Sequence, residues 1–134
     1  MMKYLLDTHV LIWALTGDKK LPTQIRQLIE DEQNIIYYSS VSVFEVEIKK
    51  MVHPDEELPS GETLIRDARK SGYRLLPLDN SHILAIKSLD RGKCENHKDP
   101  FDWLLVSQSK VEDMGFLTVD SKILQYNEPC VKHM

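Results

Sequence analysis

The sequence of 134 residues carries a formal charge of −4, with 42% hydrophobic and 28% charged residues. This length and composition are typical of a globular protein, and we expect residues 1–134 to form a single domain. The acidic balance argues against a protein whose main task is to coat nucleic acid, because such proteins need many Lys and Arg side chains to neutralise phosphates.

The sequence also argues against secretion and membrane insertion. Asp7 and His9 interrupt the apolar N-terminal stretch, and no window reaches the roughly 18 continuous apolar residues of a membrane-spanning helix. The two cysteines, Cys94 and Cys130, are too few for a disulfide scaffold and lack metal-ligand spacing. We therefore expect a cytoplasmic protein with no membrane association.

The first part of the chain alternates strand and helix signals. A short apolar run at 3–6, KYLL, ends at Asp7, as expected for a central parallel strand that is buried on both faces. Gly17 is a helix end signal, and Ser39 or Ser40 is a helix start signal. The predicted elements that follow the first strand are helix 8–17, helix 22–33, strand 34–40 and helix 41–52.

The same alternation continues to the C-terminus. The predicted elements are helix 62–72, strand 73–78, helix 81–89, helix 100–115, strand 116–119 and helix 121–126. Strands that alternate with helices indicate a parallel sheet covered on both faces, with right-handed crossovers. The predicted fold class is therefore α/β.

Four acids are candidates for a common site. Asp7 directly follows the first strand, Asp120 directly follows the fourth, and Glu45 lies in the first turns after the second. The carboxyl ends of parallel strands meet at one edge, so these three acids are expected there. Asp102, in the first turn of its helix, joins them only if that helix begins at the same edge. Clustered carboxylates repel one another and indicate a divalent cation, with oxygen ligands favouring Mg²⁺ or Mn²⁺.

Each acid also has a structural interpretation. Asp7 can cap the next helix, Glu45 can form a capping box with Ser42, and Asp120 can be a turn residue. Asp99 is favoured as the N-cap of the helix that begins at Pro100, rather than as a ligand. The five histidines, His97 among them, form no zinc-binding pattern and are predicted to lie on the surface.

Four ordered motifs add a family resemblance: LLDTHVLIWAL, SSVSVFEVEIKK, HKDPFDWLLVSQS and FLTVDSKILQY. Together they resemble a PIN-domain toxin of the VapC type over residues 3–126. The resemblance implies a PIN-like three-layer α/β/α sandwich with a central, mainly parallel sheet of four or five strands. It also implies the toxin of a type II toxin–antitoxin system, a Mg²⁺- or Mn²⁺-dependent endoribonuclease that uses a metal-activated water.

The family's acidic residues fall on Asp7, Glu45, Asp102 and Asp120, which would be both the metal ligands and the catalytic residues. The family further suggests a homodimer and a small antitoxin whose tail occupies the groove. Trp103 departs from the pattern, because relatives commonly carry Arg there. The tail NEPCVKHM is short, which leaves a fifth strand open.

Two other functions remain open at this point. A phospho-accepting receiver module is also a doubly wound α/β fold, although it needs an acidic pair at the first strand, where Asp7 stands alone. The other alternative is a PIN-like domain that has lost catalysis and serves only as a binding partner.

Overall fold

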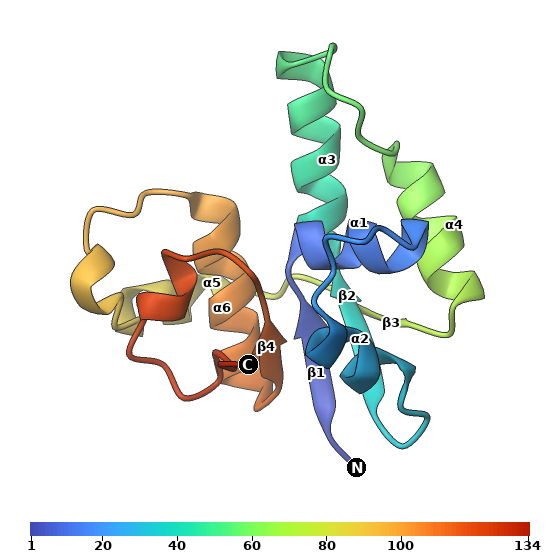
Figure 1. Ribbon diagram of the computed structural model, residues 1–134. Helices are drawn as coiled ribbons and strands as arrows, with labels where there is room; N and C mark the ends of the chain where they lie inside the picture. The colour runs from blue at the N-terminus through green and yellow to red at the C-terminus, as the bar shows by residue number, and fades with distance from the viewer.

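Four parallel strands form the centre of the computed structural model, which describes residues 1–134 (Figure 1). They are β1 (Lys3–Leu6), β2 (Ile35–Ser39), β3 (Arg74–Leu76) and β4 (Gly115–Leu117). Their order across the sheet is β3-β2-β1-β4, with Tyr4 level with Ile36 on one side and with Gly115 on the other. The expected parallel sheet is confirmed.

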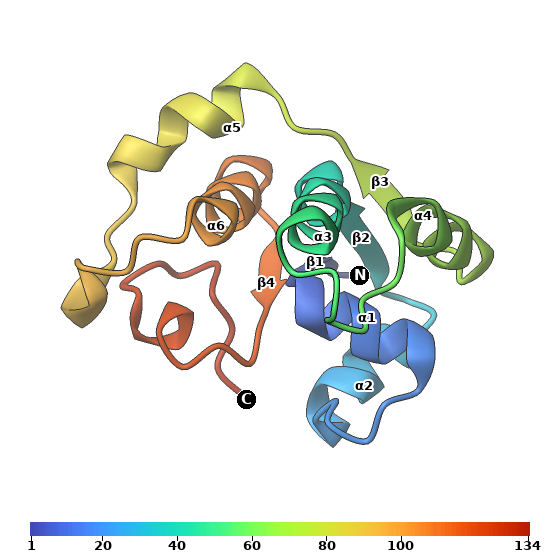
Figure 2. The ribbon, with the colours of Figure 1, turned by 90° about the horizontal axis from the view of Figure 1, so that it is seen from above.

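Helices cover both faces of this sheet. They are α1 (Thr8–Thr16), α2 (Thr23–Glu30), α3 (Ser40–Val52), α4 (Gly61–Lys70), α5 (Asn80–Leu84) and α6 (Pro100–Glu112). Seen from above, α3 and α6 lie on one side of the strands, whereas α1 and α2 lie on the other (Figure 2). The arrangement is the expected three-layer α/β/α sandwich. None of the helices has the length and apolar character needed to cross a membrane.

The central strand β1 is apolar at residues 4–6 because both of its faces are buried there. In β1, Tyr4 and Leu6 belong to a cluster that includes residues of α1, α2 and α4, while Leu5, which points the other way, packs with residues of α6 and β4. Side chains alternate between the faces of a strand, so a strand covered on both sides has no polar positions. This explains why KYLL ends at Asp7, where the strand leaves the sheet.

The strand order creates a switch point between β1 and β4. The chain moves from β1 outwards to β2 and β3, then returns to place β4 on the other side of β1. In open α/β sheets, ligands bind outside the carboxyl ends of the strands at such a point. The order also differs from that of receiver modules, in which the first strand lies between the second and third.

Several predicted helices end earlier than expected, for example α2 at Glu30 and α6 at Glu112, and two are partly or wholly 3₁₀. The segment 81–89 contains α5, extended by a 3₁₀ turn at Ala85–Ser88. The segment 121–126 contains only a 3₁₀ turn at Ile123–Gln125, because Tyr126 already has an extended backbone with ψ at 141°. A third 3₁₀ turn, Gly92–Cys94, lies in the loop before α6.

The C-terminal tail forms no fifth strand. It lies beside β4 through a single parallel bridge between Phe116 and Val131. The Phe116 N–H donates to the Cys130 carbonyl at 2.7 Å, and the Lys132 N–H donates to the Phe116 carbonyl at 3.1 Å. Pro129, which has no N–H, precedes this bridge and cannot extend the ladder. The sheet therefore has four strands.

Candidate active site

Asp7 is held rigidly where β1 meets α1. Its backbone N–H donates to the Leu117 carbonyl of β4 at 3.0 Å, which fixes it at the switch point. Its Oδ1 accepts from the Thr8 N–H at 2.8 Å, so it does cap α1. Its Oδ2 accepts from the Thr118 hydroxyl at 2.6 Å. The structural and functional interpretations of Asp7 are therefore compatible, because capping uses one oxygen at the edge of the site.

Glu45 lies in the second turn of α3 and is buried. Ser39 is the N-cap of this helix and accepts from the Val41 N–H, so the alternative capping box with Ser42 does not form. Instead, Oε1 of Glu45 accepts from the Thr8 hydroxyl at 2.7 Å, and that hydroxyl also lies 2.8 Å from the Ser42 hydroxyl. These contacts direct Glu45 towards the start of α1.

Asp102 reaches the same edge because α6 begins there. Asp99 is the N-cap, as predicted, and its Oδ1 accepts from the N–H groups of Phe101 and Asp102 at 3.0 and 3.3 Å. Pro100 occupies the first helical turn, where its missing N–H has no cost. Asp102 is buried in that same turn, near the positive end of the helix dipole.

Asp120 closes the cluster from the end of β4. Its N–H donates to the Thr118 hydroxyl at 3.0 Å, so Thr118 links the backbone of Asp120 to the carboxylate of Asp7. Its Oδ1 accepts from the N–H groups of Lys122 and Ile123 at 2.8 and 3.3 Å. Asp120 is thus a turn residue, as its structural interpretation predicted, and its side chain also lines the cavity.

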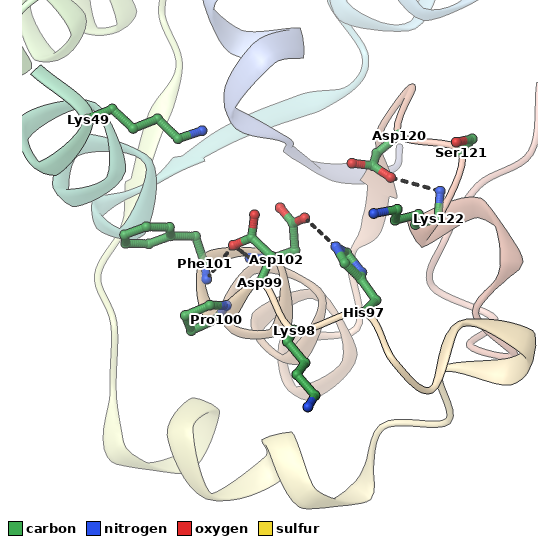
Figure 3. Close-up of a pocket in the computed structure, with 10 residues that line it drawn as sticks. All are labelled: Lys49, His97, Lys98, Asp99, Pro100, Phe101, Asp102, Asp120, Ser121 and Lys122. Atoms are coloured by element: carbon green, nitrogen blue, oxygen red, sulfur yellow. Dashed lines mark hydrogen bonds and ion pairs between the residues drawn. The ribbon is translucent and has the colours of Figure 1, made fainter. Parts of the chain in front are cut away.

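The structure brings all four predicted acids to one place. Asp7, Glu45, Asp102 and Asp120 line a single cavity of about 360 Å³. A neighbouring groove of about 810 Å³ shares Lys49, Asp99, Asp102 and Asp120 with this cavity (Figure 3). The roles of these acids in binding metal and in catalysis stay predictions.

Burial and mutual repulsion act on these carboxyls. Burial raises the pKa of Asp7 to about 6, against the hydrogen bonds from Thr118 and Thr8. Burial raises the pKa of Asp102 further, to about 9. The charges of four neighbouring acids add to the effect on Asp102, namely Asp7, Asp99, Asp120 and Glu45. A bound cation would relieve this repulsion, and the donor set consists of the hard oxygens that Mg²⁺ and Mn²⁺ prefer. The residues present therefore fit a divalent cation.

Lys49 places a positive charge beside the cluster. Its Nζ lies 2.6 Å from Oε2 of Glu45, one helical turn away in α3. Burial alone would lower the pKa of the Lys49 ammonium, but the hydrogen bond and charge of Glu45, together with Asp99 and Asp102, raise it. Lys49 is therefore an internal counterion that partly neutralises the acids.

Two histidines are not the surface residues that the sequence predicted, because His82 is 1% exposed and His97 is 9% exposed. His97 lies in the site, with its Nε2 3.2 Å from Oδ2 of Asp102 (Figure 3). One ligand atom each from His97, Asp102 and Asp120 lie within 4.8 Å of one another. The missing His-x-x-His pattern argues only against a metal site built on one helix. It says nothing about a contact such as that between His97, in a loop, and Asp102, in α6.

Sequence reasoning also missed the hydroxyl side chains that orient the acids. Thr8, Ser42 and Thr118 are buried, and each hydroxyl is hydrogen-bonded to another group of the site. The available signals were Thr8 directly after Asp7 and Thr118 two residues before Asp120. A single Thr in these positions is common in turns, so the signal was weak.

Comparison with known proteins agrees with this geometry. The family model described as the PIN domain matches residues 4–129. Among solved structures, a similar one is the crystal structure of VapBC2 from Rickettsia felis bound to a DNA fragment from their promoter. It aligns with a TM-score of 0.58 and 18% sequence identity over 89% of this chain and 88% of that chain, a likeness in fold. No curated protein matches the sequence.

Proposed function

Because this chain belongs to the PIN-domain family, we propose that it is a divalent-metal-dependent endoribonuclease and the toxin component of a type II toxin–antitoxin system. The observation that carries the proposal is the meeting of four carboxylates, from four separate segments, around one cavity. Burial and the neighbouring acids raise the pKa values of two of them, Asp7 and Asp102, and a bound cation would offset the repulsion.

Asp7, Glu45, Asp102 and Asp120 would hold the cation, which is Mg²⁺ or Mn²⁺ in this proposal. When bound, such a cation activates water and neutralises charge on a phosphodiester. The chain's own contribution is to hold the oxygen ligands in place. Thr118 and the Thr8 N–H fix both oxygens of Asp7, and the Thr8 hydroxyl fixes Glu45.

RNA would lie in the adjoining groove. The groove is open and polar, and Lys49, Lys98 and Lys122 line it together with the acids. A polyanion can approach four carboxylates only if cations offset the repulsion, and these lysines supply positive charge along the approach. The proposed substrate is therefore an RNA segment that enters this groove, with its phosphates facing the lysines.

An antitoxin and a second copy of the chain are the proposed protein partners. The similar structure from Rickettsia felis is described as VapBC2 bound to a DNA fragment from their promoter, which supports an antitoxin partner. Apolar side chains on α3 also support a partner, since Phe44, Met51 and Val52 are 54%, 78% and 63% exposed. A small antitoxin would place a basic segment near the acids and cover apolar surface that the chain alone leaves in water.

Cleavage of RNA by the purified chain tests the proposal. We expect cleavage with Mg²⁺ or Mn²⁺, loss of activity with EDTA, and a decrease of at least about a hundredfold for Asp7→Asn. Glu47→Gln is the matched control, because Glu47 is an exposed acid on α3, two residues from Glu45. Retention of activity by Asp7→Asn would refute the assignment of the site.

A second measurement separates the enzyme from a binding-only domain. If the chain binds Mn²⁺ and an antitoxin but cleaves no RNA substrate, the domain is a partner protein without catalysis. Co-expression with the product of the neighbouring open reading frame tests the antitoxin directly. We expect a co-purifying complex in which RNA cleavage is suppressed.

A further inference from the structure

We propose that His97 is a positioning residue whose imidazole, held between the Tyr126 hydroxyl and the Asp102 carboxylate, orients Asp102 for cation binding. The inference rests on the proposed metal site and adds to it a residue outside the four acids. It also gives a role to Trp103, the residue that departs from the family pattern.

The contacts of the imidazole define a buried chain of three side chains. Nδ1 of His97 lies 2.7 Å from the Tyr126 hydroxyl, and Nε2 lies 3.2 Å from Oδ2 of Asp102. The exposed fraction of Tyr126 is 3%, and its ring packs edge-on against the imidazole, with centroids 5.9 Å apart. Both ring nitrogens are therefore committed, and water has little access to replace either contact.

The chemistry of the three groups fixes the direction of the hydrogen bonds. A carboxylate that binds a cation can only accept hydrogen bonds, so Nε2 of His97 must carry the proton. In the neutral imidazole Nδ1 is then an acceptor, and the Tyr126 hydroxyl, 2.7 Å away, donates to it. Tyr126 thus selects the tautomer of His97 that donates to Oδ2 of Asp102 and so holds the orientation of this carboxylate.

The backbone of His97 is anchored as firmly as its ring. The Trp103 Nε1–H donates to the His97 carbonyl at 2.8 Å, and an Arg91 N–H donates to the same oxygen at 3.0 Å. The Arg91 guanidinium lies over the Trp103 ring, 5.2 Å from its centroid. Trp103 therefore ties the loop before α6 to the helix and keeps His97 beside Asp102.

Direct ligation by His97 is the competing arrangement. The ligand atoms of His97, Asp102 and Asp120 are close enough to share an ion. Nε2 cannot donate a proton to Asp102 and coordinate a cation at the same time, however, so the two arrangements exclude each other. The contact with Asp102 favours the positioning role, because ligands of metals are commonly held by such second contacts.

The test uses Mn²⁺ as the probe and its binding as the readout, measured by electron paramagnetic resonance. We expect His97→Ala to weaken Mn²⁺ binding by about tenfold. Tyr126→Phe, which removes only the hydroxyl, should weaken it by a smaller factor. His97→Gln should restore much of the affinity, since its amide can donate to Asp102. His53→Ala, at an exposed histidine, is the control and should bind as wild type does.

A double substitution tests whether Tyr126 acts through His97. In the His97→Ala background, Tyr126→Phe should cause no further loss of Mn²⁺ affinity, whereas independent effects would add. Thermal unfolding of each variant establishes that it is folded, and Tyr126→Phe provides a conservative variant if His97→Ala is unstable.

Three results would overturn the inference in distinguishable ways. Unchanged Mn²⁺ affinity in folded His97→Ala refutes the positioning role alone. A nitrogen coupling to Mn²⁺ in the wild-type spin-echo spectrum, absent in His97→Gln, shows that His97 is a ligand instead. If wild type binds no Mn²⁺, or Asp102→Asn binds it equally well, the proposed metal site fails together with this inference.

Discussion

At the scale of single residues, the buried carboxylates of the site repel one another. Without a bound cation, this repulsion lowers the free energy of unfolding of the protein. Asp102 is buried among other acids, and Lys49 neutralises Glu45 from the rim of the cavity. Removing one charge at a time therefore has opposite effects on two properties. The metal-free protein should gain stability when an acid is neutralised, whereas cation binding should be lost.

Asp102→Asn should stabilise the metal-free protein, increasingly so as the pH rises. The folded-state pKa of about 9 lies above the ordinary value of 3.8, so the folded protein binds this proton more tightly than the unfolded chain does. The contribution of Asp102 to the free energy of unfolding is highest below about pH 4 and falls as the pH rises towards 9.

Asparagine does not titrate, so the free energy of unfolding of Asp102→Asn does not fall in this way as the pH rises. Unfolding by urea in EDTA measures the difference, and we expect the variant to be more stable by at least about 1 kcal/mol at pH 8. Near pH 4 the difference should be small. A variant less stable than wild type at pH 8 would contradict the idea that repulsion and burial destabilise the ionised Asp102.

Lys49→Met should strengthen Mn²⁺ binding. The lysine competes with a cation for Glu45, and the loss of this partly buried ion pair corresponds to a gain of up to about fivefold, or about 1 kcal/mol. The KM for RNA should rise, because the groove loses a positive charge. Isothermal titration measures the affinity for Mn²⁺, and cleavage kinetics measure the KM for RNA. Lys50→Met is the control, because the Lys50 ammonium donates to the Leu58 carbonyl and not to an acid of the site.

At the scale of elements, the site depends on where helices and loops begin. Asp7 caps α1 and Asp99 caps α6, so both helices start at the edge where the strands end. The loop before α6 is held by a second set of contacts, because the Asn127 N–H donates to the Asp90 carbonyl at 2.9 Å. The geometry of this loop determines where His97 lies.

Gly92→Ala tests the role of that loop. Gly92 has a φ of +57°, and a Cβ there would lie 2.3 Å from the Gln125 carbonyl oxygen. We expect a loss of more than about 1 kcal/mol in the free energy of unfolding and weaker Mn²⁺ binding, because the loop must shift. Gly17→Ala is the matched control, with a φ of +66° but open space around the added atom. It should lose about 1 kcal/mol and leave Mn²⁺ binding unchanged.

At the scale of the whole molecule, cation binding and folding should be coupled. Four segments that are distant in sequence must all be folded to form the cavity, so the unfolded chain has no comparable site. A cation that binds only the folded state stabilises it by about 2.7 kcal/mol at a hundred times its Kd.

Thermal unfolding measures this coupling directly. MgCl₂ or MnCl₂ should raise the Tm of wild type, and NaCl of equal ionic strength should not. The increase should be largely lost in Asp7→Asn. An equal increase in that variant would show that the cations act elsewhere on the acidic surface.

Much of the fold and the list of acids followed from local patterns. The apolar run KYLL, the cap at Asp99 and the stop at Gly17 each reflect chemistry within a few residues, and the structure agrees with all three. The last predicted helix was wrong, because apolar spacing at 121–126 does not distinguish a helix from a single turn that packs against the core.

The sequence by itself indicated the parallel α/β fold and the placing of Asp7, Glu45 and Asp120 at the carboxyl edge of the sheet, because apolar periodicity and the alternation of strands with helices can be read along the chain. Only the tertiary structure decided that α6 brings Asp102 to the same edge, that Tyr126 and His97 lie behind Asp102, and that Thr118 joins two of the acids. These contacts join segments far apart in the chain, and such pairings depend on how the layers pack rather than on any spacing in the sequence.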